Sequence, residues 1–335
     1  MKKFLLILGS IFIIFGIVYL AGPKFPQPKL DNKLPEIFLQ ASEVESYIKT
    51  KEAKLKIKPD NESRIIWAND SLKTKTEYCL LYLHGFAACW YEGSPVNIDF
   101  AHRYGMNLYA PLLASHGIDT TEALIDMTPD RLYESAKEAL VVAHKLGEKV
   151  ILMGTSTGGT LMLKLAAEFP ELSDGLILLS PNIAINDPAA FLISKQWGLQ
   201  LARFVKKGNY RVSATKYPEE RQYWICRQRL ESAVYLQQLL DATMNRKTFE
   251  KVKKPVFLAY YYKDKAYQDS TVRVDAMLKM FDELATPKDL KEKIAFPEAG
   301  CHPIGCKLFS GAWKDIEFAS DRFAEEKLGM KPLKE

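Results

Sequence analysis

The sequence predicts a protein of the α/β class, with an open and mostly parallel sheet that is covered by helices on both faces. Short apolar runs with β-branched residues, which are typical of buried strands, alternate with amphipathic helical patterns along most of the chain. Within residues 149–163, a strand pattern, a tight glycine-containing turn and a helical pattern follow one another directly. Alternation of this kind implies parallel strands joined by right-handed crossovers.

In the first half of the chain, each predicted strand is a short apolar run that ends near turn-forming residues. Each predicted helix carries apolar positions at helical spacing, so that one side of it can be buried. The predicted strands cover residues 64–68, 78–83, 107–110 and 150–153, and the predicted helices cover residues 34–53, 129–146 and 160–169.

In the second half, the strands are predicted at residues 175–180, 256–262 and 293–296, and the helices at 271–284 and 311–327. Residues 182–254 interrupt the alternation, because they hold no convincing buried strand. An insertion of this size over the carboxyl ends of the strands predicts a helical cap. Its aromatic side chains line a pocket or form the core of the cap itself, and the sequence leaves both interpretations open.

The amino terminus predicts a membrane anchor or a signal sequence over residues 1–22. Two lysines precede eighteen uncharged, mainly apolar residues from Phe4 to Ala21. No small-x-small cleavage pattern follows, so we favour an uncleaved anchor, with a cleaved signal as the second possibility. The positive-inside rule then places the rest of the chain on the outer, extracytoplasmic side. Residues 23–33 are a proline-containing spacer, and residues 34–335 form the globular domain.

Charge and cysteine usage exclude several classes of function. The net charge of +5 is modest and the basic residues are spread along the chain, so nucleic-acid binding has little support. The five cysteines show no zinc-finger spacing. Cys301, His302 and Cys306 lack an evident fourth ligand, so we expect no metal. Cys301 and Cys306 could pair as a disulfide or stay reduced, and the odd number of cysteines leaves at least one free thiol.

The most informative motif is Gly154-Thr155-Ser156-Thr157-Gly158, between the strand at 150–153 and the following helix. A serine on such a sharp turn is exposed above the sheet, and its neighbours two positions away must be small. The first amides of the helix point toward the same place. Ser156 is therefore the candidate nucleophile for attack on a carbonyl. The alternative is a glycine-rich turn whose serine only caps the helix.

His302 is the best candidate for the base that a serine nucleophile requires. It lies on a loop after the last predicted strand, and ligands of doubly wound sheets bind beyond the carboxyl ends of the strands. For the acid that orients this base we predict Asp264, which follows the strand 256–262 almost directly, with Asp269 in reserve. The order Ser156, Asp264, His302 is that of a nucleophile-elbow enzyme. The other histidines fit loop-shaping or less specific positions: His84, His102, His116 and His144.

An acyl-transfer site also needs two amides that bind the developing oxyanion. The N–H group of Thr157, directly after the candidate nucleophile, is the first. The second is predicted to be the N–H group of Phe86, in the loop that follows the strand at 78–83. Because both donors belong to the backbone, their positions depend on the fold more than on the identity of the two side chains.

The motifs occur in this order: His84-Gly85-Phe86, Ser115-His116-Gly117, Gly154-Thr155-Ser156-Thr157-Gly158-Gly159, Asp264 and His302. Their order and spacing, over residues 64–327, resemble the α/β-hydrolase superfamily. Ser115-His116-Gly117 is similar to the Gly-His-Gly loop of its monoacylglycerol-lipase-like and serine-aminopeptidase-like members, with serine as the first residue. With the amino-terminal segment, the chain resembles membrane-anchored bacterial hydrolases of that branch. The resemblance implies an eight-stranded, mostly parallel sheet, a cap between the sixth and seventh strands, and no cofactor.

We therefore expect a serine hydrolase that cleaves a carboxylic ester, with a lipid-derived ester as the favoured substrate. The expected partners are this substrate and a membrane, and the sequence leaves the oligomeric state open. Peptide or amide hydrolysis is the alternative within the enzymes. A membrane-tethered binding module whose serine is unused is the alternative from another class.

Overall fold

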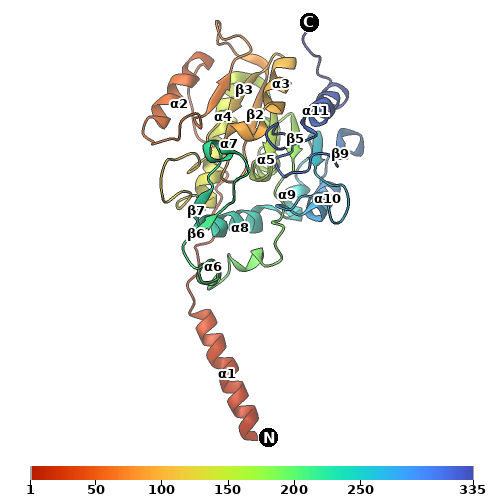
Figure 1. Cartoon of the computed structure of the whole chain (residues 1–335). Coiled ribbons are helices and arrows are strands. Elements are labelled where there is room, and N and C mark those ends of the chain that lie inside the picture. The colour runs from red at the N-terminus through yellow and green to blue at the C-terminus, as the bar shows by residue number, and fades with distance from the viewer. Residues whose placement is uncertain (1, 335) are drawn as a thin grey trace.

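The fold is a sheet of seven strands between two layers of helices, and the computed structural model describes residues 2–334 (Figure 1). In space the strands follow the order β1-β3-β2-β4-β5-β8-β9. β1 pairs antiparallel with β3, and the other neighbours in this sheet are parallel. The predicted α/β class and mostly parallel sheet are therefore confirmed. The strands are β1 (Arg64–Ile66), β2 (Thr76–Leu83), β3 (Asn107–Ala110), β4 (Gly147–Thr155), β5 (Gly175–Leu179), β8 (Val256–Tyr260) and β9 (Lys291–Ala295).

The strand number differs from the eight that the family resemblance implies. Each strand range predicted from an apolar run overlaps one of the seven strands, with ends that differ by up to three residues, but within residues 2–334 no further strand pairs beyond β1. The chain before β1 is occupied by α2 (Val44–Glu52), which is shorter than the helix predicted over 34–53. After α2, Ile57 makes only an isolated antiparallel bridge with Ile118. An additional edge strand therefore does not form.

The two faces of the sheet are covered by different helices. Along β2, Leu81 and Leu83 belong to one apolar core, whereas Leu80 and Tyr82 belong to the other, as the alternation of side chains in a strand requires. The first core includes α2, α4, α5 and α10, and the second includes α3 and α11. The helices outside the insertion are α1 (Lys2–Leu20), α2, α3 (Val96–Arg103), α4 (Pro129–Leu146), α5 (Thr157–Glu168), α10 (Val274–Glu283) and α11 (Trp313–Lys327), with short 3-10 turns η1 (Ala41–Glu43), η2 (Trp90–Gly93), η3 (Pro170–Leu172) and η5 (Lys288–Leu290).

The insertion, residues 182–254, lies between β5 and β8 and is mainly helical. It also contains an antiparallel pair of short strands that the sequence pattern did not predict. Its helix α8 packs against α4 and α5 of the body. A small apolar cluster of Leu199, Leu230 and Val234 lies inside the insertion and receives Phe25 from the amino-terminal segment. The elements are η4 (Ala190–Leu192), α6 (Gly198–Lys206), β6 (Tyr210–Val212), α7 (Pro218–Tyr223), β7 (Arg227–Arg229), α8 (Glu231–Thr243) and α9 (Arg246–Phe249).

The amino-terminal helix α1 projects away from the rest of the protein (Figure 1). By length and composition alone, the segment Lys3–Leu20 of this helix could cross a membrane. A signal sequence passes the same test. The segment that follows α1 is docked on the domain. Phe25 packs edge-on against Tyr235 with ring centroids 5.3 Å apart, and the Leu30 amide donates a 2.8 Å hydrogen bond to the Asp130 carboxylate.

Lys137 fixes the end of this segment and offers a test of the docking. It is fully buried on α4, and its Nζ donates hydrogen bonds to the carbonyl oxygens of Asp31 (2.5 Å) and Lys33 (2.6 Å). We expect Lys137→Met to lower the free energy of unfolding by about 2 kcal/mol, because two carbonyls lose their charged donor. Urea unfolding of the two proteins measures the difference. Lys279→Met, on the exposed surface of α10, is the control and should change the stability by less than about 0.5 kcal/mol.

Candidate functional site

Ser156 lies on the predicted tight turn between β4 and α5. Its backbone has φ 53° and ψ −119°, a conformation that costs an L residue roughly 1–3 kcal/mol. Two backbone hydrogen bonds hold this turn: the Ser156 amide donates to the Leu179 carbonyl (3.0 Å), and the Asn182 amide donates to the Ser156 carbonyl (2.9 Å). A Cβ atom on Gly158 would overlap the carbonyl oxygen of Leu83. A glycine two positions after the serine is therefore a steric requirement of the fold.

A cavity of about 690 Å³ lies over this turn. Ser156, Phe86, Glu92 and His302 contribute to it from the loops at the carboxyl ends of the strands. The rest of its lining comes mostly from the insertion and is largely apolar, including Leu192, Ile193, Leu201, Val205, Trp224, Ile225 and Leu236. Of the insertion's aromatic residues, Trp224 therefore lines the cavity, whereas Tyr223 stacks on Tyr91 with ring centroids 4.1 Å apart. Trp224 thus has the first of the two roles that the sequence left open, whereas Tyr223 packs on η2 outside the insertion.

His302 follows β9 and lies at the same cavity as Ser156. Its Nδ1 is 2.7 Å from Oδ2 of Asp269, which fixes the orientation of the ring. Its Nε2 has no hydrogen-bond partner among the described residues and is buried. Burial acts to lower the pKa of His302, but the charge of Asp269 and the hydrogen bond to it outweigh this effect, so the pKa is raised. The imidazole is thus held ready to accept a proton on the nitrogen that Asp269 does not occupy.

The prediction of Asp264 as the partner of His302 is wrong, and the reserve candidate Asp269 takes that position. After β8 the chain forms a tight turn in which Oδ1 of Asp264 accepts hydrogen bonds from the amides of Ala266 (2.8 Å) and Tyr267 (2.9 Å). This turn leaves Asp264 exposed and brings the chain back toward the sheet. Asp264 is therefore a turn residue, the use that a lone aspartate after a strand commonly has.

Asp269 is almost completely buried, with 1% of its surface exposed. Its Oδ1 accepts hydrogen bonds from the amides of Thr271 (2.8 Å) and Val272 (3.0 Å), and its Oδ2 faces His302. Burial acts to raise the pKa of Asp269, but the charge of His302 and these hydrogen bonds lower it below its usual value. The side chain is therefore an ionised, fixed partner for the imidazole.

The two amides predicted to bind an oxyanion lie in the two loops that meet at Ser156. Thr157 is the first residue of α5, so its N–H group has no acceptor within the helix. Phe86 lines the cavity and follows Gly85. A Cβ atom on Gly85 would be 2.9 Å from Cβ of Ser156, which shows how closely this loop packs on the serine. The binding of an oxyanion by these amides stays a prediction.

Two buried histidines support the loop that carries Phe86. Nε2 of His84 accepts a hydrogen bond from the Leu113 amide (3.1 Å), so its Nδ1 carries the proton and donates to the Gly85 carbonyl (2.8 Å). The ring of His116 packs edge-on against it, with centroids 4.9 Å apart. Burial lowers the pKa of His84 to about 3 and that of His116 to about 4. Both rings are therefore neutral, and they shape the loop as the sequence predicts.

Glu92 is a site residue that the sequence analysis missed. It is 3% exposed, lines the cavity, and its Oε2 accepts a 2.5 Å hydrogen bond from the Gly85 amide. Burial raises its pKa to about 7, although the Gly85 amide and the charge of His302 act in the opposite direction. Nothing in the local pattern around Trp90-Tyr91-Glu92 distinguishes it from a surface glutamate, since its burial arises from loops that are distant in sequence.

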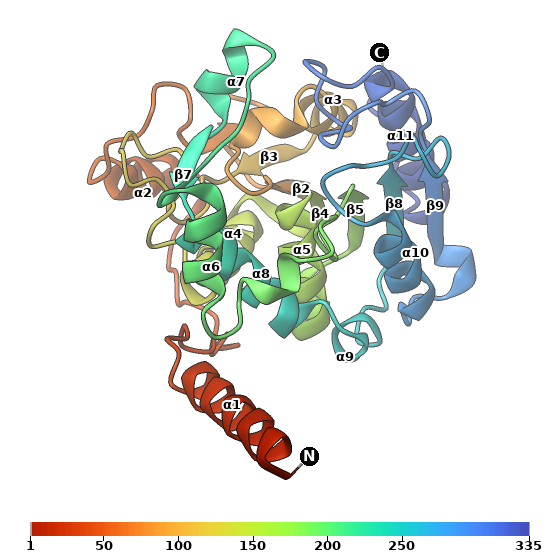
Figure 2. The same cartoon turned by 60° about the horizontal axis from the view of Figure 1, so that its bottom comes forward.

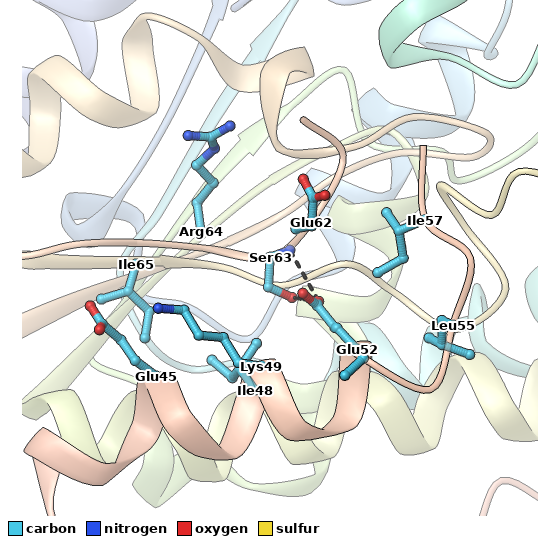
Figure 3. A pocket seen from close by; sticks show the side chains of 11 residues that line it. Glu45, Ile48, Lys49, Glu52, Leu55, Ile57, Glu62, Ser63, Arg64 and Ile65 are labelled. Atoms are coloured by element: carbon cyan, nitrogen blue, oxygen red, sulfur yellow. Dashed lines mark hydrogen bonds between the residues drawn. The ribbon is translucent and has the colours of Figure 1, made fainter. Parts of the chain in front are cut away.

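A second cavity, of about 540 Å³, lies between α2 and β1 (Figure 3). It shares no residue with the cavity at Ser156. Two of its three acidic side chains have partners within the protein, and the third, Glu62, is exposed. Glu52 accepts hydrogen bonds from the amide and the hydroxyl of Ser63, and Glu45 accepts one from the indole of Trp67. This cavity is lined by no histidine and no cysteine.

Two cysteines lie close to His302 in the sequence. Cys301 and Cys306 are both free thiols, and Sγ of Cys301 lies 3.7 Å from the Pro303 carbonyl oxygen. Within the part of the chain that the structure describes, no group of three or more histidine, cysteine, aspartate or glutamate residues is arranged to hold a metal ion. His302 is instead paired with Asp269.

A family model and several known proteins are similar to this chain. The family model described as serine aminopeptidase, S33, matches residues 130–302, which is more than half of the chain. The chain belongs to this family of α/β-hydrolases. The matched region begins in α4 and ends at His302, so it contains Ser156, Asp269 and the insertion.

Among curated proteins, methylesterase 1 of Arabidopsis thaliana is 34% identical to this S33-family chain over 101 residues. That segment is 30% of this chain and 36% of the methylesterase, so the chain spans about a third of the length of this relative.

Solved structures resemble the fold over a larger part of the chain. One is from the metagenome-derived lipolytic enzymes LipS and LipT, with a TM-score of 0.64, 15% identity, and coverage of 80% of this chain and 98% of that chain. Another is the monoacylglycerol lipase of Paleococcus ferrophilus, with a TM-score of 0.56, 16% identity, and coverage of 79% and 98%. At these identities the likeness concerns the fold alone.

The pairing of His302 with Asp269, in place of the predicted Asp264, can be tested directly. We expect Asp269→Asn to lower the pKa of His302 by about one unit or more, because an adjacent carboxylate stabilises the imidazolium. Asp264→Asn should leave it unchanged. Titration of the imidazole resonances by NMR measures both, and His302→Gln identifies the resonance. Equal effects of the two variants would contradict the pairing seen here.

The buried carboxyl group of Glu92 predicts a pH-dependent stability. In the unfolded chain it ionises near 4.5, whereas in the folded chain it keeps its proton up to a pH of about 7. Because the folded state binds the additional proton, the contribution of Glu92 to the free energy of unfolding should fall by roughly 3 kcal/mol as the pH rises from 4.5 to 7.

Glu92→Gln keeps an acceptor for the Gly85 amide and removes the titration. The variant should therefore gain stability relative to the unchanged protein as the pH rises from 5 to 7. Thermal unfolding at pH 5, 6 and 7 measures this difference. Glu62→Gln, at an exposed position, serves as the control, and a difference that does not vary with pH would refute the assignment.

Proposed function

We propose that the protein is a serine hydrolase that cleaves carboxylic esters through an acyl-enzyme intermediate. One observation carries this proposal. Ser156, in a strained turn between a strand and a helix, lines the same cavity as His302, and Nδ1 of His302 is hydrogen-bonded to the buried Asp269. This combination provides a nucleophile, a base and an orienting acid in one place.

The reaction would begin with attack of Ser156 Oγ on the carbonyl carbon of the ester. The hydroxyl proton passes to Nε2 of His302, and Asp269 stays ionised and stabilises the imidazolium. The negative charge on the carbonyl oxygen is bound by the N–H groups of Phe86 and Thr157. The alcohol then leaves with the proton from His302. A water molecule, deprotonated by the same imidazole, attacks the acyl group. The acid is released as the imidazolium returns this proton to Oγ of Ser156.

We propose a lipid-derived ester as the substrate. The largely apolar lining of the cavity and its volume of about 690 Å³ are suited to an acyl chain. The methylesterase among the similar proteins supports ester chemistry. The same catalytic groups can attack an amide, so peptide hydrolysis is the outcome to be distinguished by experiment.

We further propose that α1 anchors the protein in a membrane, with the hydrolase domain on the outer side and the insertion acting as a cap over Ser156. The apolar length of α1 and the two lysines that precede its apolar run support this orientation. The lining that the insertion contributes to the cavity supports its role as a cap.

The nucleophile is tested with a fluorophosphonate probe on the full chain in detergent. We expect covalent labelling at Ser156, and a loss of ester turnover on the order of 10³-fold or more in Ser156→Ala. Ser213→Ala is the matched control, since this serine lines the same cavity but has no partner histidine. Labelling that persists in Ser156→Ala would place the nucleophile elsewhere.

The class of substrate is tested with nitrophenyl esters of increasing acyl length and with the corresponding anilides. Preference for longer esters supports a lipid-derived substrate, and preference for anilides supports amide hydrolysis. Absence of both labelling and turnover would favour a membrane-tethered binding module.

A further inference from the structure

An exposed apolar surface lies on the insertion around η4 and α6. Six large apolar side chains within residues 191–205 are exposed, whereas the other such side chains outside α1 are spread between residues 38 and 333. Phe204 has the largest exposed fraction of the six, 82%. Clustered exposure of this kind typically marks a contact surface. We call this surface the apolar face, and it consists of Phe191, Leu192, Trp197, Leu201, Phe204 and Val205.

The helix α6 has apolar side chains on two sides. Leu199 and Ala202 pack inward with Val234, so the helix is attached to the rest of the insertion. Leu201 and Phe204 remain exposed on the other side. Packing within the domain therefore accounts for the inner side, whereas Phe204 in particular has its apolar ring in solvent.

The position of the apolar face relative to α1 indicates what this partner is. Nε1 of Trp197 donates a 3.0 Å hydrogen bond to the Val18 carbonyl in the last turns of α1, and the Trp197 amide donates to the Pro23 carbonyl (3.2 Å). Figures 1 and 2 show α6 as the part of the folded domain that lies next to α1. The apolar helix α1 and the apolar face thus meet at one residue.

We propose that the apolar face lies in the interfacial layer of the lipid bilayer that α1 spans. The inference rests on the proposed anchoring by α1 and adds the orientation of the domain: α6 lies on the membrane. A helix can lie at the boundary between head groups and acyl chains with its apolar side immersed. The strength of this binding increases with the apolar area that is removed from water. The Trp197 ring, at the junction, has the polar and apolar parts that favour this layer.

The charges around the apolar face fit an anionic lipid surface. Lys206 and Lys207 follow Val205 directly, are exposed, and make no ion pair among the described residues. Arg203 is already paired with Glu231 at 2.7 Å, and Lys195 lies 3.7 Å from Asp241. The two free lysines at the end of α6 can therefore contact lipid phosphates while the apolar side chains enter the bilayer.

The same segment also forms part of the cavity at Ser156. Leu192, Leu201, Val205 and Lys206 line it. An ester lipid could therefore pass from the bilayer along α6 to Ser156 without its acyl chain crossing water. The orientation thus implies a substrate that resides in the membrane, with a long acyl chain and an ester near the head-group level.

The contact is tested on the full chain in vesicles of phosphatidylcholine and phosphatidylglycerol whose acyl chains are brominated. Flotation first verifies that the protein is inserted. Bromine atoms quench indole fluorescence at short range, so Trp197 should be quenched, and the difference from Trp197→Phe isolates its signal among the five tryptophans. The double variant Phe191→Asp/Phe204→Asp alters two exposed side chains that do not line the cavity. It should lose most of this quenching.

Phe318→Asp is the matched control, since Phe318 is 72% exposed on α11, which lies far from α1 in Figure 1. It should leave the quenching unchanged. Hydrolysis of a long-chain ester placed in the vesicles should fall about tenfold or more in the double variant, because two apolar anchors are lost. Hydrolysis of a water-soluble short-chain ester should stay the same.

The outcomes separate the inference from the proposals on which it rests. Quenching of Trp197 without any ester turnover would refute the hydrolase function and support the membrane contact. Insertion of α1 without quenching of Trp197, or equal quenching in the double variant, would refute the contact and leave the anchor intact. A chain that does not float with vesicles would refute the anchor and the contact together.

Discussion

The candidate site depends on the close contact between the turn at Ser156 and the end of β2. The strands β2 and β4 are parallel neighbours, with Leu83 opposite Gly154, so both end at the same edge of the sheet. Gly158 then packs directly against the Leu83 carbonyl, which leaves no room for a side chain. This contact and the hydrogen bond to Leu179 hold the serine in a conformation that it would not adopt alone. Every other group of the site is placed by loops that leave the same edge.

Much of this arrangement could be predicted from the sequence because it follows from local patterns. Strands buried on both faces are short apolar runs, so the ranges of the seven strands were recognisable. The turn at Ser156 needs small residues at fixed positions, and these are visible in the sequence. His302 follows the last strand, and the rule that ligands bind at the carboxyl ends of strands places it correctly.

The remaining parts of the site depend on tertiary contacts. Asp264 is nearer to its strand in sequence, but a hydrogen-bonded turn carries it into solvent and returns the chain so that Asp269 faces His302. No residue pattern reveals how far such a turn extends. Glu92 is hidden in a similar way, since its burial depends on the packing of Gly85 and of loops far along the chain. The eighth strand was expected from the family resemblance alone, and here α2 precedes β1 in its place.

The two neutral histidines behind the Phe86 loop have a consequence for how the site responds to acid. With pKa values of about 3 and about 4, His84 and His116 stay uncharged through the mildly acidic range. Over that range Glu92, which faces the cavity, takes up a proton, whereas these two rings take up none. The amide of Phe86 thus keeps its place while the charge in front of it changes. Mild acid therefore changes the charge that a bound molecule meets in the cavity but not the charge of the two histidines behind the Phe86 loop.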